Sequence, residues 1–327
     1  AALITTYDPI YCNLSSVGGA AHGAVTDGLL QEIDVRTGLV MFQWSSLDHV
    51  ALAESYELAV SSHTDWPFDF FHINSIGLTH DGSLLVSARN TWTVYDVDSA
   101  TGQIQWQLGG KHPSFTMGPG TNAAWQHDPR ELPDGTFSVF DNGAAPKVHS
   151  QSRGIVLSID PQLKITTLVG QFTRPAPLLA YSQGNMQALP GGDWFMGWGQ
   201  VPAFSELSPT GRLLFDAHFP AGDQSYRDFR FVWTGVPAHP PTFVVARGSG
   251  GASAVYASWN GATEVASWRV LAGTSATRMR TVAKRLRTGF ETAIPVPAGA
   301  PGPYVTVQAL DAEGRVLGVA PTAVRLG

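Results

Sequence analysis

Four side chains in this sequence have the chemistry to act together on an anionic group, and they are His72, Asn74, Arg89 and His127. A neutral imidazole can act as a nucleophile. A second imidazole, an amide and a guanidinium can stabilise negative oxygens around the reacting atom. If the four side chains converge, the set suits the transfer of an anionic group from one molecule to another.

Both histidines stand near the start of a predicted strand that runs to a glycine turn. Three segments share this layout, and they are residues 70–82, 125–135 and 182–192. A lone histidine is more often structural than functional, but repetition of the same layout favours a functional interpretation. In a radial repeat fold, equivalent strands face one axis, so we expect the polar side chains of these segments to converge.

Strand alternation predicts the local geometry of the first segment. His72 and Asn74 are two residues apart, so they should share one face of the strand while Ile73 points to the other. Polar groups beside apolar neighbours are costly unless they meet a ligand or each other. Arg89, on the returning strand 86–89, is expected near them, where its guanidinium can bind an anion through two N–H groups. A salt bridge at the strand end is the competing interpretation.

Hairpins of alternating strands recur along the first two thirds of the chain. Asp34, Asp96 and Asp160 each lie in such a hairpin and stand about sixty residues apart, a spacing typical of four-stranded propeller blades. Each unit then has an inner hairpin with the polar strand and an outer hairpin. The sequence therefore predicts an all-β fold that begins with about four antiparallel blades of a partial β-propeller.

Composition agrees with this class and limits the partners. The chain has 327 residues, of which only 14% are charged, and it is rich in glycine (35) and proline (22), as expected for short strands joined by tight turns. A net charge of −6 argues against nucleic acid or an anionic membrane surface as the main partner. No segment is long and apolar enough to predict a membrane span.

Signatures of other site types are absent from the sequence. No His, Cys, Asp and Glu set has the ligand spacing of a zincin or a zinc finger, so we expect no metal. Neither a Gly-x-Ser-x-Gly elbow nor a P-loop occurs, and we expect no cofactor. A single cysteine, Cys12, excludes an internal disulfide framework.

A change in composition predicts a domain boundary near the proline-rich residues 237–241. We expect propeller blades over residues 1–236 and a separate domain over residues 240–327. The second part has short alternating strands and a buried-type tryptophan, which indicate a β-sandwich of immunoglobulin or fibronectin type III kind. No cluster with evident chemistry lies there, so an accessory role is expected.

At the candidate residues the sequence resembles the arylsulfotransferase family. The motifs that carry the resemblance are residues 69–76, 87–89, 125–127 and 140–143, and it covers roughly residues 1 to 235. Members of this family are β-propeller enzymes that move a sulfuryl group from an aryl sulfate to a phenol without a nucleotide sulfate donor.

The resemblance implies a role for each candidate residue. His127 matches the histidine that is transiently sulfurylated, while His72, Asn74 and Arg89 match groups that hold the sulfate oxygens. The implied reaction is ping-pong transfer through a sulfohistidine, with a small-molecule aryl sulfate and a phenol as partners. The family and the low-lysine, β-rich composition also imply a secreted or extracytoplasmic protein.

The chain departs from the family pattern at its start. The family has a further histidine strand before the position where this sequence begins, and about four blades do not close a propeller of about six. Three explanations remain open: the chain is a fragment, a partner chain supplies the missing blades, or this member is a shortened variant.

Two alternative functions come from other classes. A non-catalytic propeller would act as a binding or scaffold protein, with the sandwich as a second contact module. A quinoprotein-like redox propeller would explain the rhythm of Asp34 to Trp44, which a similar run from Asp98 to Trp106 repeats. His149 and Arg153 are weak further candidates at the rim of the site.

Overall fold

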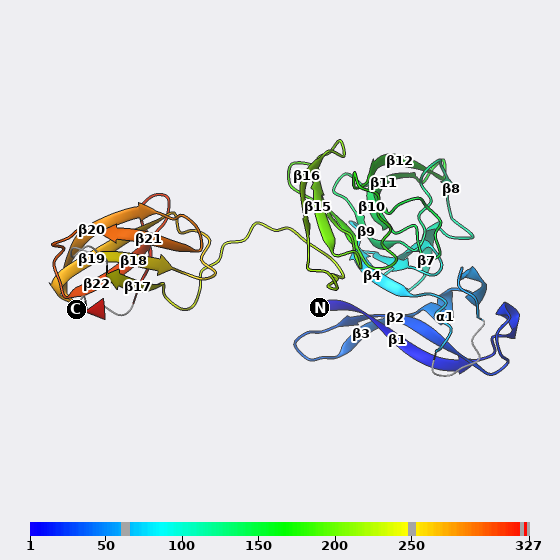
Figure 1. Cartoon of the computed structure of the whole chain (residues 1–327). Helices are drawn as coiled ribbons and strands as arrows, with labels where there is room; N and C mark the ends of the chain where they lie inside the picture. The colour runs from blue at the N-terminus through cyan, green and yellow to red at the C-terminus, as the bar shows by residue number, and fades with distance from the viewer. Residues whose placement is uncertain (60–65, 248–252, 321–323, 326–327) are drawn as a thin grey trace. The chain divides into compact units, whose positions relative to one another are not determined.

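The computed structural model describes residues 1–59, 66–247, 253–320 and 324–325 of the chain (Figure 1). Strands hold 47% of the structure and helices 3%, which confirms the predicted all-β class. The chain divides into two compact units, Ala1–Arg230 and Phe231–Gly327. In the described part of the chain, no helix is long and apolar enough to cross a membrane.

The first unit consists of sheets that follow one another along the chain. The first has the order β1-β2-β3, the second β4-β5-β6-β7, the third β8-β12-β11-β10-β9 and the fourth β13-β14-β15-β16. All neighbours are antiparallel except β8 and β12, which are parallel. The strands are β1 (Ala2–Cys12), β2 (Gly23–Ile33), β3 (Val40–Ser45), β4 (Ile73–Leu78), β5 (Leu84–Ala88), β6 (Thr93–Val97), β7 (Ile104–Gly109), β8 (Thr116–Met117), β9 (His127–Glu131), β10 (Phe137–Asp141), β11 (Arg153–Asp160), β12 (Ile165–Phe172), β13 (Asn185–Ala188), β14 (Trp194–Gly197), β15 (Ala203–Leu207) and β16 (Leu213–His218). Of three short helical turns, η1 (Ser15–Val17) lies between β1 and β2, and α1 (Ser46–His49) and η2 (Leu52–Glu54) lie between β3 and β4.

The predicted glycine turns connect the inner hairpins. The turn N–H to C=O bonds Thr79–Ser83, Leu132–Thr136 and Leu189–Asp193 close the same turn in three successive sheets. Gly82 and Gly135 occupy the left-handed region there, with φ of 88° and 80°. Glycine adopts this region without the Cβ clash of other residues, so these turns follow directly from local sequence.

Neighbouring sheets share cores, which is how propeller blades pack. In strand β5, Val86 is buried in the core shared with the first sheet, while Leu85 is buried in the core shared with the third. A third core joins Phe140 of the third sheet to Met196 of the fourth. The inner strand β9 contacts both β4 of the second sheet and β13 of the fourth. The sheets are blades of a β-propeller, as the sequence predicted.

The second unit is built from two further sheets (Figure 1). Their strands are β17 (Thr242–Arg247), β18 (Ser253–Ser258) and β21 (Glu291–Val296) in one, and β19 (Ser267–Ser275), β20 (Arg278–Leu286), β22 (Tyr304–Leu310), β23 (Val316–Val319) and β24 (Val324–Arg325) in the other. One core contains Val255 and Ile294 from the first of these sheets and Trp268 and Val307 from the second. The unit is therefore a β-sandwich, and its likeness to immunoglobulin or fibronectin type III domains stays a prediction.

Candidate active site

The four candidate residues lie where inner strands of the second and third sheets begin or end. His127 is the first residue of β9 and Asn74 the second of β4, whereas His72 precedes β4 and Arg89 follows β5. The prediction that His72 and Arg89 lie inside strands was therefore wrong. His72 has a φ of 54°, and the pairing of β4 with β5 shifts register between Ile73 and Ser75, so simple alternation does not apply.

A carboxylate holds His72 in this left-handed conformation. Asp69 accepts the backbone N–H of His72 at 3.1 Å through Oδ1, and its Oδ2 contacts the ring nitrogen Nδ1. An ionised carboxylate only accepts hydrogen bonds, so Nδ1 carries a hydrogen. Asp69 is itself anchored, because its carbonyl oxygen accepts Nδ2–H of Asn90 at 2.6 Å. The remaining nitrogen of His72, Nε2, is therefore the one that can exchange a proton.

An amide, by contrast, holds His127. Asn142 donates from Nδ2 to the carbonyl oxygens of Ala180 and Gln183, both at 2.9 Å, which fixes the orientation of its amide. Its Oδ1 then lies 2.8 Å from Nδ1 of His127 and can only accept, so Nδ1 carries the hydrogen. The lone pair of neutral His127 is on Nε2. That nitrogen accepts the backbone N–H of Gln183 at 3.1 Å.

Burial keeps His127 neutral. Only 1% of the residue is exposed, and this burial is the largest cause that lowers the pKa of His127 from 6.5 to about 3. The hydrogen bond that His127 donates to Asn142 opposes the shift, while the charges of His72, Arg89 and Arg227 add to it. His127 is therefore an uncharged imidazole with a defined lone pair at neutral pH.

Arg89 links the second sheet to the loops around His127. Its guanidinium lies 4.6 Å from the ring centre of Trp125, and Nη2 donates to the carbonyl oxygens of Tyr181 at 3.2 Å and Ala145 at 3.3 Å. The nearest carboxylate oxygen, from Glu57, is 3.9 Å away. Burial lowers the pKa of Arg89. The guanidinium is thus positioned by carbonyls and a ring rather than by a close strand-end salt bridge.

Asn74 joins the same network. Its Nδ2 donates to the carbonyl oxygen of Gln126 at 2.7 Å, next to His127 in the chain, and this contact fixes the amide. Oδ1 of Asn74 is buried and has no hydrogen-bond partner among the described residues. One amide hydrogen and one acceptor oxygen of Asn74 thus have no partner among the described residues.

Two residues at this centre were missed by the sequence analysis. Tyr226 and Arg227 follow the fourth sheet, yet Arg227 donates from Nη2 to the carbonyl oxygen of Asn74 at 2.9 Å. The Tyr226 ring lies 6.2 Å from the His127 ring. No strand or turn pattern marks this segment. Two amides of the predicted strand bind this segment: Asn185 binds the backbone of Asp228 at 2.7 and 2.8 Å, and Gln187 binds that of Arg230 at 3.0 and 2.8 Å.

A tyrosine of the first sheet also approaches the centre. The Tyr7 ring lies 5.9 Å from the ring of His72, and its hydroxyl donates to the carbonyl oxygen of Ile73. Burial, and then the charges of Asp69 and Tyr226, raise the pKa of Tyr7. Its hydroxyl stays protonated at neutral pH.

The two weak rim candidates have a structural role. His149 and Arg153 each approach Oδ2 of Asp141 at 2.8 Å, and Asp141 is fully buried. Oδ1 of Asp141 accepts the backbone N–H of Ala124 at 2.9 Å. These contacts fix the loop that leads into β9.

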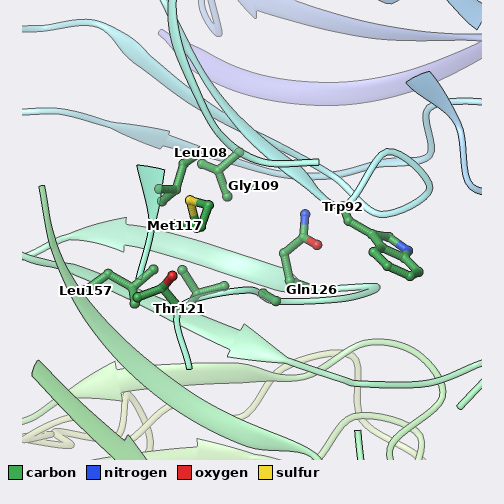
Figure 2. A pocket seen from close by; sticks show the side chains of 10 residues that line it. Trp92, Leu108, Gly109, Met117, Thr121, Gln126 and Leu157 are labelled. Atoms are coloured by element: carbon green, nitrogen blue, oxygen red, sulfur yellow. The ribbon is translucent and has the colours of Figure 1, made fainter. Parts of the chain in front are cut away.

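A pocket lies between the second and third sheets, and Gln126 belongs both to its lining and to this network (Figure 2). Its lining is largely apolar and includes Leu108, Met117 and Leu157. Gln126 closes one end, where its amide donates to the carbonyl oxygens of Ala88 at 3.0 Å and Thr93 at 3.1 Å. None of the four candidate residues lines this pocket. In the described residues, no group of three His, Cys, Asp or Glu side chains could hold a metal ion.

Solved structures similar to this chain resemble it only distantly. A protein of unknown function from Bacteroides caccae is 12% identical over 93% of this chain and 92% of its own, with a TM-score of 0.35. Virginiamycin B lyase from Staphylococcus aureus is 10% identical over 94% and 96%, with a TM-score of 0.33. A PQQ-bound aldose sugar dehydrogenase from Streptomyces coelicolor is 14% identical over 73% and 75%, with a TM-score of 0.31. At these scores the likeness says nothing about the chemistry of this chain.

The sequence comparison is more specific. No curated protein sequence matches this chain. The sequence profile of the arylsulfotransferase (ASST) family matches residues 1–220, which span all four propeller sheets. The matched region contains His72, Asn74, Arg89 and His127. The chain therefore belongs to the arylsulfotransferase family.

Proposed function

We propose that this protein transfers a sulfuryl group from an aryl sulfate to a phenol and that His127 carries the group in between. Membership of the arylsulfotransferase family supports the reaction class. The observation that carries the role of His127 is its fixed tautomer. Since Nδ1–H donates to Asn142, the lone pair lies on Nε2, and burial keeps the imidazole neutral, as a nucleophile requires.

In the first half-reaction, Nε2 of His127 attacks sulfur. The nitrogen–sulfur bond forms while the sulfur–oxygen bond to the phenolate breaks. Arg89 and the remaining amide hydrogen of Asn74 offset the charge on the sulfate oxygens that stay bonded to sulfur. In the second half-reaction a phenol oxygen attacks sulfur, the nitrogen–sulfur bond breaks, and His127 returns to its neutral form. Positioning and electrostatic stabilisation supply the catalysis, as in phosphoryl transfer.

One contact must open during each cycle. Nε2 of His127 accepts the N–H of Gln183, and the imidazole is almost fully buried. A lone pair that accepts a hydrogen bond does not attack sulfur. Turnover therefore includes displacement of the Gln183 peptide, which has a left-handed φ of 64°.

A sulfuryl-transfer assay tests this function. The protein is mixed with p-nitrophenyl sulfate and phenol, and release of p-nitrophenolate and formation of phenyl sulfate are followed. We expect both products with the wild type and neither with His127→Ala. His80→Ala is the matched control, because His80 is exposed and pairs with Glu131 outside the network. Failure of the wild type to form phenyl sulfate would reject the function and favour a non-catalytic propeller.

A further inference from the structure

We propose that His72, oriented by Asp69, carries the proton of the transfer reaction. It would protonate the departing phenolate in the first half-reaction and deprotonate the incoming phenol in the second. This inference rests on the proposed function, and it gives Asp69 the role of a positioning residue.

The two histidines differ in the partner that holds Nδ1. Nδ1 of His72 faces the carboxylate of Asp69, which accepts the Nδ1 hydrogen and leaves Nε2 to carry a lone pair or a second hydrogen. Nδ1 of His127 faces the neutral amide oxygen of Asn142 at 2.8 Å. The carboxylate leaves Nε2 of His72 open to proton exchange, whereas Nε2 of His127 accepts the N–H of Gln183 and burial keeps that ring neutral. The two rings are therefore suited to different tasks.

The two histidines also differ in their exposure to solvent. About a third of the His72 side chain is exposed (36%), while His127 is buried. In the part of the chain that the structure describes, no group hydrogen-bonds to Nε2 of His72, whereas Nε2 of His127 accepts the N–H of Gln183. Among the described residues, Nε2 of His72 therefore has no hydrogen bond to give up when it meets a substrate oxygen.

Three other polar side chains of the centre, His127, Tyr7 and Arg89, are unsuited to exchange this proton. Once His127 carries the sulfuryl group, its Nε2 is bonded to sulfur and its Nδ1–H is committed to Asn142. Tyr7 has a raised pKa and donates its hydroxyl hydrogen to the carbonyl oxygen of Ile73. The guanidinium of Arg89 is not a proton donor under these conditions. An imidazole is the side chain suited to proton exchange near neutral pH.

Bonds and protons balance in both proposed half-reactions. In the first, the sulfur–oxygen bond breaks, Nε2 of His127 bonds to sulfur, and Nε2–H of His72 passes its proton to the phenolate oxygen. In the second, the acceptor phenol passes its proton to Nε2 of His72 while its oxygen bonds to sulfur and the nitrogen–sulfur bond breaks. Both histidines then have their starting protonation, and no further reactant is needed.

The dependence of the sulfurylation rate on the leaving group tests whether His72 carries the proton. Single-turnover sulfurylation of the wild type and of Asp69→Asn is measured with p-nitrophenyl sulfate and with 4-methylphenyl sulfate. p-Nitrophenolate is a stable anion that leaves without a proton, whereas 4-methylphenolate needs one. We expect the substitution to slow the 4-methylphenyl reaction by about 10²-fold or more and the p-nitrophenyl reaction by less than about 10-fold.

Two further variants provide a second test of the proton role and a control. His72→Gln should show the same selective loss even if Asp69→Asn does not fold. Asp34→Asn, in a turn of the first sheet where Asp34 caps the N–H of Arg36, should leave both reactions unchanged. Equal losses with both donors in the Asp69 and His72 variants would overturn the proton role while leaving the transfer function standing. No sulfurylation of the wild type by either donor would overturn both.

Discussion

A closed ring of hydrogen bonds sets the state of His127. Nδ1–H donates to Oδ1 of Asn142, Nδ2 of Asn142 donates to the carbonyl oxygen of Gln183, and the N–H of Gln183 donates to Nε2. The residue that fixes the Asn142 amide, Gln183, also covers the nucleophilic lone pair of His127. The tautomer needed for attack is thus present before substrate binds, although the lone pair is not yet free.

The depressed pKa of His127 predicts how stability depends on pH. The folded protein holds this ring neutral down to about pH 3, whereas the unfolded chain takes up the proton near pH 6.5. Its contribution to the free energy of unfolding is fully present above pH 6.5 and falls by about 1.4 kcal/mol per pH unit as the pH drops toward 3. Urea unfolding of the wild type and His127→Gln at pH 4 to 7 measures it. The variant should lose this slope; identical slopes would contradict the assigned state of His127.

At the scale of elements, the segment after β16 clamps the inner strands. Arg227 lies 3.3 Å from Oδ1 of Asp128, which is 1% exposed, and it donates to the carbonyl oxygen of Asn74. One side chain thus connects the end of the propeller unit to β4 and β9. Arg130 also binds Asp128, so this carboxylate has two cationic partners.

Removing this clamp should cost stability. Arg227→Met leaves Asp128 with one cationic partner and the Asn74 carbonyl without its guanidinium donor, and we expect a loss of about 1–3 kcal/mol in the free energy of unfolding of the propeller unit. Arg227→Lys should recover part of it. The matched control is Arg230→Met, since Arg230 forms an exposed ion pair with Glu206 that should contribute less than about 1 kcal/mol. Equal effects of the two methionine variants in urea unfolding would rule out the clamp.

Local sequence predicted the elements better than the site. The turns at Gly82 and Gly135 depend on residues within one hairpin, so strand pattern and glycine positions were enough to place them. The conformation of His72 depends on Asp69, and no alternation rule includes that contact. The position of Arg227 depends on hydrogen bonds between the Asn185 side chain of β13 and the backbone of Asp228, about forty residues later. No local sequence pattern reveals this contact.

At the scale of the whole molecule, the two units have separate cores. The sandwich core contains Ile294, Trp268 and Val307, and the propeller cores draw on none of these residues. Each unit therefore contributes its own apolar burial to stability, and the candidate site lies entirely in the first.

A core substitution in the sandwich should consequently leave transfer intact. Ile294→Ala removes a side chain that is 1% exposed, and we expect it to destabilise the sandwich by about 2–5 kcal/mol. Calorimetry should show a lower midpoint for one transition, with the rate of sulfuryl transfer at 25 °C unchanged. Val244→Ala, at an exposed position of β17, should change stability by less than about 0.5 kcal/mol. Parallel loss of stability and transfer in Ile294→Ala would show that the units depend on each other.

The site of the covalent label tests the central claim most directly. The protein is mixed with p-nitrophenyl sulfate alone, quenched, digested and examined by mass spectrometry under conditions that preserve sulfohistidine. The account predicts one added sulfuryl group on the peptide that contains Trp125 to Arg130, located at His127, and no label in His127→Ala. A label on His72 instead would reverse the roles of the two histidines. Continued turnover without any label would mean direct transfer between substrates and would contradict the sulfohistidine pathway.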